Sequence, residues 1–132
     1  MTWVQMEGGY LSTAELGSLI NEADLALLCY DTAEQVTSGV LIEAIGAGLP
    51  VVATAFPHAI EMLAGGAGSI VPHRDHRAIA RALEWYLRHP AALRAACVMA
   101  SRVSRRMSWL SVALDYERLA SHTLEGRTPS VA

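Results

Sequence analysis

The sequence contains no lysine, and no arginine occurs before position 74. The first 72 residues carry eight acids and no Lys or Arg, a formal charge of −8, whereas the remainder carries ten arginines and five acids, a formal charge of +5. Phosphate sites usually combine backbone amides with a cationic side chain, so a phosphate held by the first part needs a cation from elsewhere. Arg77, Arg81 and Arg88 alternate with Glu84 at the spacing of a solvated helix face, which does not favour a nucleic-acid partner.

Cysteine is scarce as well, with only Cys29 and Cys97 present and no CxxC or Cys/His spacing between them. We expect two reduced, buried thiols rather than a disulfide or a metal site. The five histidines form no H-x-x-x-H pair, and there is no DxD-like pair of carboxylates. No metal is therefore expected.

No long uninterrupted apolar run is present. The most apolar stretch, residues 39–60, contains Glu43, Pro50, Pro57 and His58, which indicates protein core rather than a membrane span. The N-terminus lacks a basic start followed by an apolar block, so no secretory signal is predicted and a cytoplasmic protein is expected. With 132 residues, 52% hydrophobic and 17% charged, the chain should form one compact domain over residues 1–124, followed by a frayed tail at 125–132.

Strand and helix signals alternate along the chain. Ser12 and Glu15 form a capping box that predicts a helix to about residues 21–23, and Asp75, Pro90 and Ser108 mark three later helix starts. Further helices are predicted at 40–47 and 59–63, and strands at 3–6, 25–29, 50–54 and 69–71. The run at 25–29 is continuously apolar, which is typical of a strand covered on both faces. The predicted fold is an α/β, Rossmann-like parallel sheet with flanking helices.

The last predicted helix carries a set of apolar residues suited to packing: Trp109, Val112, Ala113, Tyr116 and Leu119.

Ligands of open α/β sheets bind beyond the carboxyl ends of the strands, which selects the loops at 30–39, 54–58 and 72–76. The first loop is the richest, because Thr37, Ser38 and Gly39 lead into a helix whose free N–H groups suit a phosphate. Glu43, one turn further, has only apolar neighbours in sequence, and a carboxylate buried there would need hydrogen bonds such as those of ribose hydroxyls. The alternative is that Thr37 and Ser38 only cap the helix and that Glu43 only supports its first turns or pairs with an internal donor.

The segment E-A-I-G-A-G-L-P-V-V-A-T at residues 43–54 carries a family resemblance. Together with the segments around it, from about residue 11 to 119, it resembles the C-terminal, donor-binding half-domain of retaining glycosyltransferases of the GT-B fold, family 4, the glycosyl transferases group 1. The family motif is a Glu, seven residues, and then Glu-Ala. Here Gln35 occupies the place of the first Glu, and Glu34 lies one residue earlier.

The resemblance implies roles for the residues of the first loop. Glu43 would bind the ribose of a nucleotide sugar, and the backbone of Thr37, Ser38, Gly39 and Val40 would receive its diphosphate or sugar. Gln35 would lie near the transferred sugar but cannot supply negative charge, so Glu34 is the alternative catalytic helper. No metal or other cofactor is implied. For His58 and Glu61 we favour a packing or surface role over contact with the donor.

The family's enzymes pair an N-terminal acceptor domain with a C-terminal donor domain, and they use an Arg and a Lys on the diphosphate. We therefore expect this chain to be a donor-side piece that lacks its N-terminal side, transfers a hexose only with a missing acceptor domain, and meets a membrane only through that domain. Two alternatives are a non-catalytic nucleotide-binding module and an α/β scaffold that forms homo-oligomers. The base, the sugar and the acceptor stay open.

Overall fold

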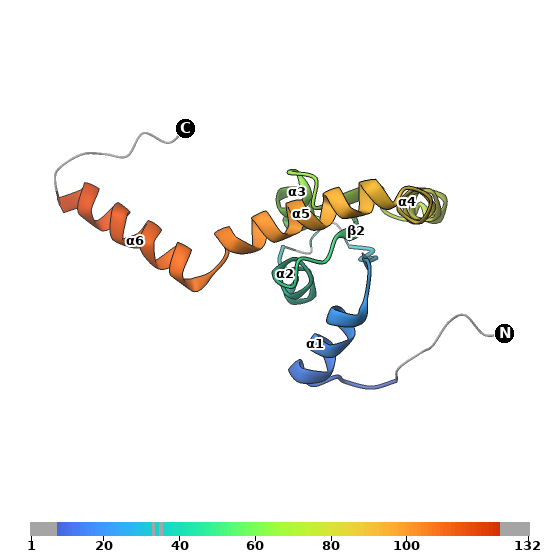
Figure 1. The fold of residues 1–132 in the computed structure, drawn as a ribbon, viewed down its shortest axis with the longest axis horizontal. Helices are drawn as coiled ribbons and strands as arrows, with labels where there is room; N and C mark the ends of the chain where they lie inside the picture. The colour runs from blue at the N-terminus through green and yellow to red at the C-terminus, as the bar shows by residue number, and fades with distance from the viewer. Residues whose placement is uncertain (1–7, 33, 35, 125–132) are drawn as a thin grey trace.

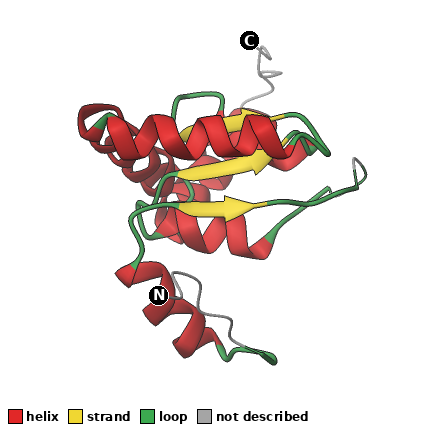
Figure 2. Cartoon of the chain, turned by 90° about the vertical axis from the view of Figure 1, so that its right-hand side faces the viewer, coloured by secondary structure: helices red, strands yellow, loops and turns green. Residues whose placement is uncertain are grey.

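The computed structural model describes residues 8–32, 34 and 36–124. Within them a three-stranded parallel sheet of order β1-β2-β3 is flanked by helices on both faces (Figure 1 and Figure 2). The predicted α/β, Rossmann-like parallel architecture is confirmed. The strand predicted at 3–6 and the tail predicted at 125–132 lie outside the described residues.

The elements alternate as predicted. In chain order they are α1 (Thr13–Glu22), β1 (Ala26–Leu28), α2 (Gly39–Gly46), β2 (Val51–Thr54), α3 (Pro57–Leu63), β3 (Gly68–Val71), α4 (His76–Arg88), α5 (Pro90–Arg106) and α6 (Trp109–Leu124). The predicted helix starts are confirmed: Ser12 and Glu15 form a complete capping box, Asp75 accepts from Ala78 N at 2.8 Å, and Ser108 accepts from Ser111 N at 3.2 Å.

The sheet brings all three strand ends to one edge. In the parallel register Val51 of β2 lies opposite Ala26 of β1 and Gly68 of β3, so the carboxyl ends of the strands line up. β2 is buried along its whole length, because β1 and β3 flank it and helices cover both faces. The loops that follow the strands therefore meet at the same edge.

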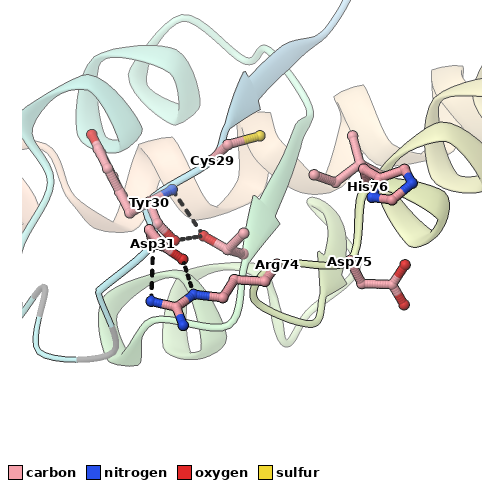
Figure 3. Close-up of a pocket in the computed structure, with 8 residues that line it drawn as sticks. Cys29, Tyr30, Asp31, Arg74, Asp75 and His76 are labelled. Carbon is pink, nitrogen blue, oxygen red and sulfur yellow. Dashed lines mark hydrogen bonds and ion pairs between the residues drawn. The ribbon is translucent and has the colours of Figure 1, made fainter.

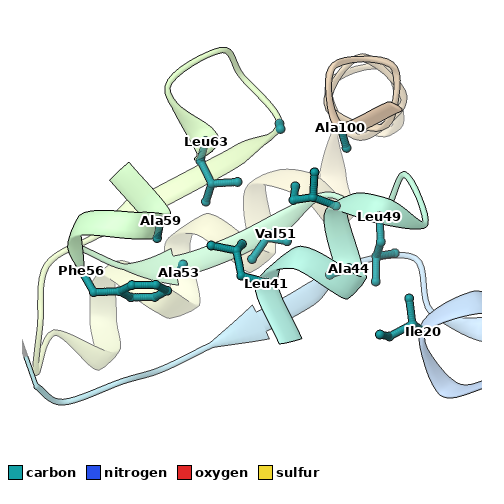
Figure 4. Close-up of a cluster of buried hydrophobic side chains, with 12 residues drawn as sticks. Ile20, Leu41, Ala44, Leu49, Val51, Ala53, Phe56, Ala59, Leu63 and Ala100 are labelled. Carbon is teal, nitrogen blue, oxygen red and sulfur yellow. The ribbon is translucent and has the colours of Figure 1, made fainter. Parts of the chain in front are cut away.

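Two hydrophobic clusters lie on the two faces of the sheet. Val51 and Ala53 pack with residues of α1, α2 and α3, as Figure 4 shows, while Val52 packs with residues of α4. Helix α5 joins both clusters, through Ala100 on the first face and Ala96 on the second. This arrangement holds α2 and α4 in fixed positions relative to the strand ends.

The strand predicted to be covered on both faces is an edge strand. β1 pairs only with β2 among the described residues, and Leu27 is 42% exposed. The prediction failed because α4, which covers the second face, makes its main contacts with β2 and β3 and not with β1. Cys29, directly after β1, is exposed and Cys97 is half-buried, so the prediction that both thiols are buried is wrong.

Helix α6 extends beyond the end of α5, away from the sheet (Figure 1). None of its residues is buried, and Trp109 is 90% exposed. In the described part of the chain only α5 makes substantial contact with this helix.

Candidate functional site

The three loops selected from the sequence meet at the backbone of Tyr30. The Thr54 hydroxyl, at the end of β2, donates to the carbonyl of Tyr30 at 2.8 Å and accepts from its N–H at 3.0 Å. Nδ1 of His73, in the loop after β3, lies 3.0 Å from the same carbonyl and must be the donor in that bond. The ends of all three strands are thus connected by side chain to backbone hydrogen bonds.

An open pocket of about 210 Å³ lies at this edge. Its lining comes from the end of β1, the end of β2 and the start of α4, as shown in Figure 3: Cys29, Tyr30, Asp31, Thr54, Arg74, Asp75, His76 and Ile79. A pocket beyond the carboxyl ends of parallel strands is the expected place for a ligand in this architecture.

A bidentate ion pair crosses the pocket rim. Nε of Arg74 donates to Oδ1 of Asp31 at 2.8 Å and a terminal guanidinium nitrogen donates to Oδ2 at 3.1 Å. These hydrogen bonds hold the pKa of Asp31 below its ordinary value and raise the pKa of Arg74. Sequence reasoning assigned neither residue, although Arg74 is the first Lys or Arg of the chain and lies in one of the selected loops.

The start of α2 is built around Ser38, which is buried. Its Oγ accepts from Leu41 N at 3.1 Å and lies 3.0 Å from the Tyr30 hydroxyl, while its own N–H donates to Nδ1 of His58 at 3.1 Å. Ser38 therefore caps the helix, which is the alternative interpretation of the sequence for this residue. Its own N–H is already hydrogen-bonded to His58. His58 links the second loop to the first through this bond.

The backbone amides of the next two residues, Gly39 and Val40, differ from that of Ser38. Within the described residues the N–H groups of Gly39 and Val40 have no hydrogen-bond acceptor, and a Cβ added at Gly39 would meet no atom within 4 Å. Glu43 follows four residues after Gly39, so its carboxylate lies on the same face of α2 one turn along. Glu43 is exposed and not enclosed by its apolar neighbours in sequence, because Leu41, Ala44 and Ile45 occupy the opposite, buried face.

The remaining predicted site residues lie in the loop before α2. Glu34 is exposed, and its N–H donates to the Thr32 hydroxyl at 3.2 Å. Thr37 is exposed and is engaged by a neighbouring group. Gln35 lies outside the described residues.

Residues 8–32, 34 and 36–124 hold no group of three His, Cys, Asp or Glu side chains arranged to bind a metal ion. No helix in this part of the chain has the length and apolar character needed to cross a bilayer.

Comparisons with known proteins agree with the α/β fold. Residues 4–89 match the family described as Glycosyl transferases group 1. The fold is similar to that of the sucrose-phosphate synthase from Thermosynechococcus elongatus, with a TM-score of 0.70 and 24% sequence identity over 90% of this chain. The chain spans 30% of the length of that structure. No curated protein matches the chain.

Proposed function

The chain belongs to the glycosyl transferases group 1 family, and from that membership we propose that it supplies the nucleotide-sugar side of a retaining glycosyl transfer. The group transferred is a hexose, and no metal ion takes part. Because this chain corresponds to 30% of the sucrose-phosphate synthase structure, we assign the acceptor to a further domain and expect no transfer by the chain alone.

The observation that supports this proposal most is the open face at the start of α2. The N–H groups of Gly39 and Val40 lack acceptors among the described residues, and they lie at the positive end of the helix dipole. A phosphate oxygen placed there accepts from both amides, and the absent side chain of Gly39 leaves room for it. In our proposal the diphosphate binds along the backbone of residues 37–40, with Ser38 shaping the turn through its cap rather than donating.

In the same proposal the Glu43 carboxylate accepts hydrogen bonds from the ribose hydroxyls. Its exposed carboxylate lies one helical turn beyond Gly39, which suits a nucleotide lying along the helix with phosphate at the start and ribose further on. A carboxylate is an acceptor only, and two vicinal hydroxyls are its natural donors. The contact is charge-assisted and therefore stronger than a bond between neutral groups.

Glu34 and Gln35 provide the proposed groups near the transferred sugar. The transition state of glycosyl transfer resembles an oxocarbenium ion, which a nearby carboxylate stabilises. Glu34 can supply that charge from the exposed loop before α2. The amide of Gln35 can hold the sugar by hydrogen bonds but cannot supply charge.

A ligand-observed NMR screen of UDP, GDP, ADP and their sugar conjugates against the full chain tests the proposal. We expect one nucleotide to bind with a Kd of about 0.1–1 mM and Glu43→Ala to abolish that binding. Glu117→Ala, which removes an exposed carboxylate on α6, is the matched control and should bind like the wild type. Equal binding by wild type and Glu43→Ala would exclude the ribose contact, and no binding to any nucleotide would overturn the proposed function.

A further inference from the structure

Arg74 is the one residue lining the strand-end pocket that carries a permanent positive charge. The first 72 residues contain no Lys or Arg, yet the loop after β3 brings Arg74 to the same edge as Tyr30 and Thr54. Tyr30 connects this pocket to the start of α2, because it lines the pocket while its hydroxyl lies 3.0 Å from Ser38 Oγ. Tyr30 therefore takes part in both places, the pocket that contains Arg74 and the start of α2.

The present partner of Arg74 is well suited to being displaced. Asp31 binds the guanidinium through two oxygens, the same forked geometry that a phosphate adopts. The two side chains are 79% and 67% exposed, and exposed ion pairs contribute little to stability. Asp75, the other carboxylate of the pocket, has other partners: its Oδ1 caps α4 and its Oδ2 lies 4.0 Å from Arg81.

The backbone at Arg74 is a separate observation. Its φ is 58°, and it is the only described non-glycine residue with a positive φ. A bulky residue is uncommon in this region, and glycine would fit it without strain. The chain places a long cationic side chain at a position where the backbone favours glycine, and Figure 3 shows that side chain extending to Asp31 at the pocket rim.

We propose that Arg74 is the cationic contact for a phosphate group of the donor and that Asp31 is the anion this phosphate replaces. The exchange breaks the two hydrogen bonds from Arg74 to Asp31 and forms two to phosphate oxygens, with no covalent change. The inference rests on the proposed function, and it answers how a donor site formed largely by the acidic part of the chain neutralises a diphosphate.

Titration of the full chain with inorganic pyrophosphate and with UDP, GDP and ADP, followed by NMR, tests the exchange. We expect Arg74→Gln to weaken pyrophosphate binding by about 10-fold or more, because a charge-assisted bidentate contact is lost. Asp31→Asn should strengthen binding several-fold, since the competing carboxylate is gone. If the pair only clamps the two loops together, both variants weaken binding, so a weaker Asp31→Asn variant overturns the proposal.

Two further variants distinguish a loss of pyrophosphate binding from a loss of folding. Arg74→Gly suits the left-handed backbone, so it should fold at least as stably as the wild type and still lose pyrophosphate binding. Arg118→Gln removes one partner of the exposed Arg118–Asp115 pair on α6 and should leave binding unchanged. Unchanged pyrophosphate binding in folded Arg74→Gly overturns the inference.

The nucleotide arm separates this inference from the proposed function. If Glu43→Ala abolishes nucleotide binding while Arg74→Gly does not weaken it, the donor site stands and the role of Arg74 is wrong. If pyrophosphate binds in an Arg74-dependent way but no nucleotide binds, the anion contact stands and the donor function fails.

Discussion

The strand β2 and the helix α6 both carry apolar residues, but only those of β2 are buried. The residues of β2 are between 0% and 3% exposed, whereas α6 has no buried residue and Tyr116 on it is 70% exposed. β2 has a strand on each side and helices over both faces, while α6 contacts chiefly the end of α5 among the described residues. Apolar composition shows which residues can be buried, and neighbouring elements decide which ones are.

The largest expected effect comes from forcing the β2–β3 pairing apart with Gly68→Ala. A Cβ at Gly68 would collide with the backbone of Val51, which cannot move without disrupting the ladder. We expect a loss of more than about 4 kcal/mol in the free energy of unfolding, or no folded protein, by urea denaturation. Gly17→Ala is the control, because a Cβ there meets no atom and alanine favours the helix by about 0.5–1 kcal/mol. Equal stabilities would contradict the packing described here.

Phe56→Ala and Trp109→Ala compare the two regions directly. Phe56 is fully buried and packs edge-on against Tyr30 with ring centroids 5.0 Å apart, so its loss should cost about 3–5 kcal/mol. Trp109 is 90% exposed, and its substitution should change stability by no more than about 0.5 kcal/mol. Both are measured by denaturant titration, and a large cost at Trp109 would show that α6 packs against something in solution.

Ser38→Ala should have an intermediate effect at the boundary between core and site. The substitution removes the cap of α2 and leaves the Tyr30 hydroxyl without its partner, with an expected cost of about 0.5–2 kcal/mol. The matched control is Ser108→Ala, which removes the cap of the exposed helix α6 and disturbs no tertiary contact seen at Ser108. A smaller cost for Ser38→Ala than for Ser108→Ala would be incompatible with the role assigned to Ser38.

The smallest expected effect is the pH dependence of the Asp31–Arg74 pair. Its hydrogen bonds to Arg74 lower the pKa of Asp31 in the folded state, so the pair stabilises the fold at neutral pH and this contribution disappears as the pH falls through that lowered pKa. NMR titration of the Asp31 carboxyl should show its pKa rising toward the ordinary value in Arg74→Gln. An unshifted pKa in that variant would show that the pair is not formed in solution.

The local features of the fold follow from sequence signals within a few residues. The capping box of Ser12 and Glu15, the caps at Asp75 and Ser108, and the alternation of strands and helices were all predictable, because each depends on interactions between near neighbours in the chain. The selection of the three strand-end loops also followed from the order of elements, since parallel strands end at one edge.

The composition of the site was predicted less completely. The pattern around Glu43 indicated a carboxylate among apolar residues, and only the placement of α2 against the sheet shows that Glu43 points outward. The Thr37-Ser38-Gly39 pattern indicated free amides, but the bond from Ser38 N–H to His58, 20 residues away, is visible only in the folded chain.

By itself the sequence determined the α/β class, the element order, the helix caps and the family motif, because these depend on local propensity and on residue types at short spacing. The packing of the elements determined which apolar surfaces are covered. It leaves Leu27 of β1 partly exposed and α6 without a buried residue. It also joined Asp31 to Arg74 across 43 residues and assembled the pocket around Tyr30. Contacts of that kind depend on how whole elements pack, and no signal within a short window of the chain encodes them.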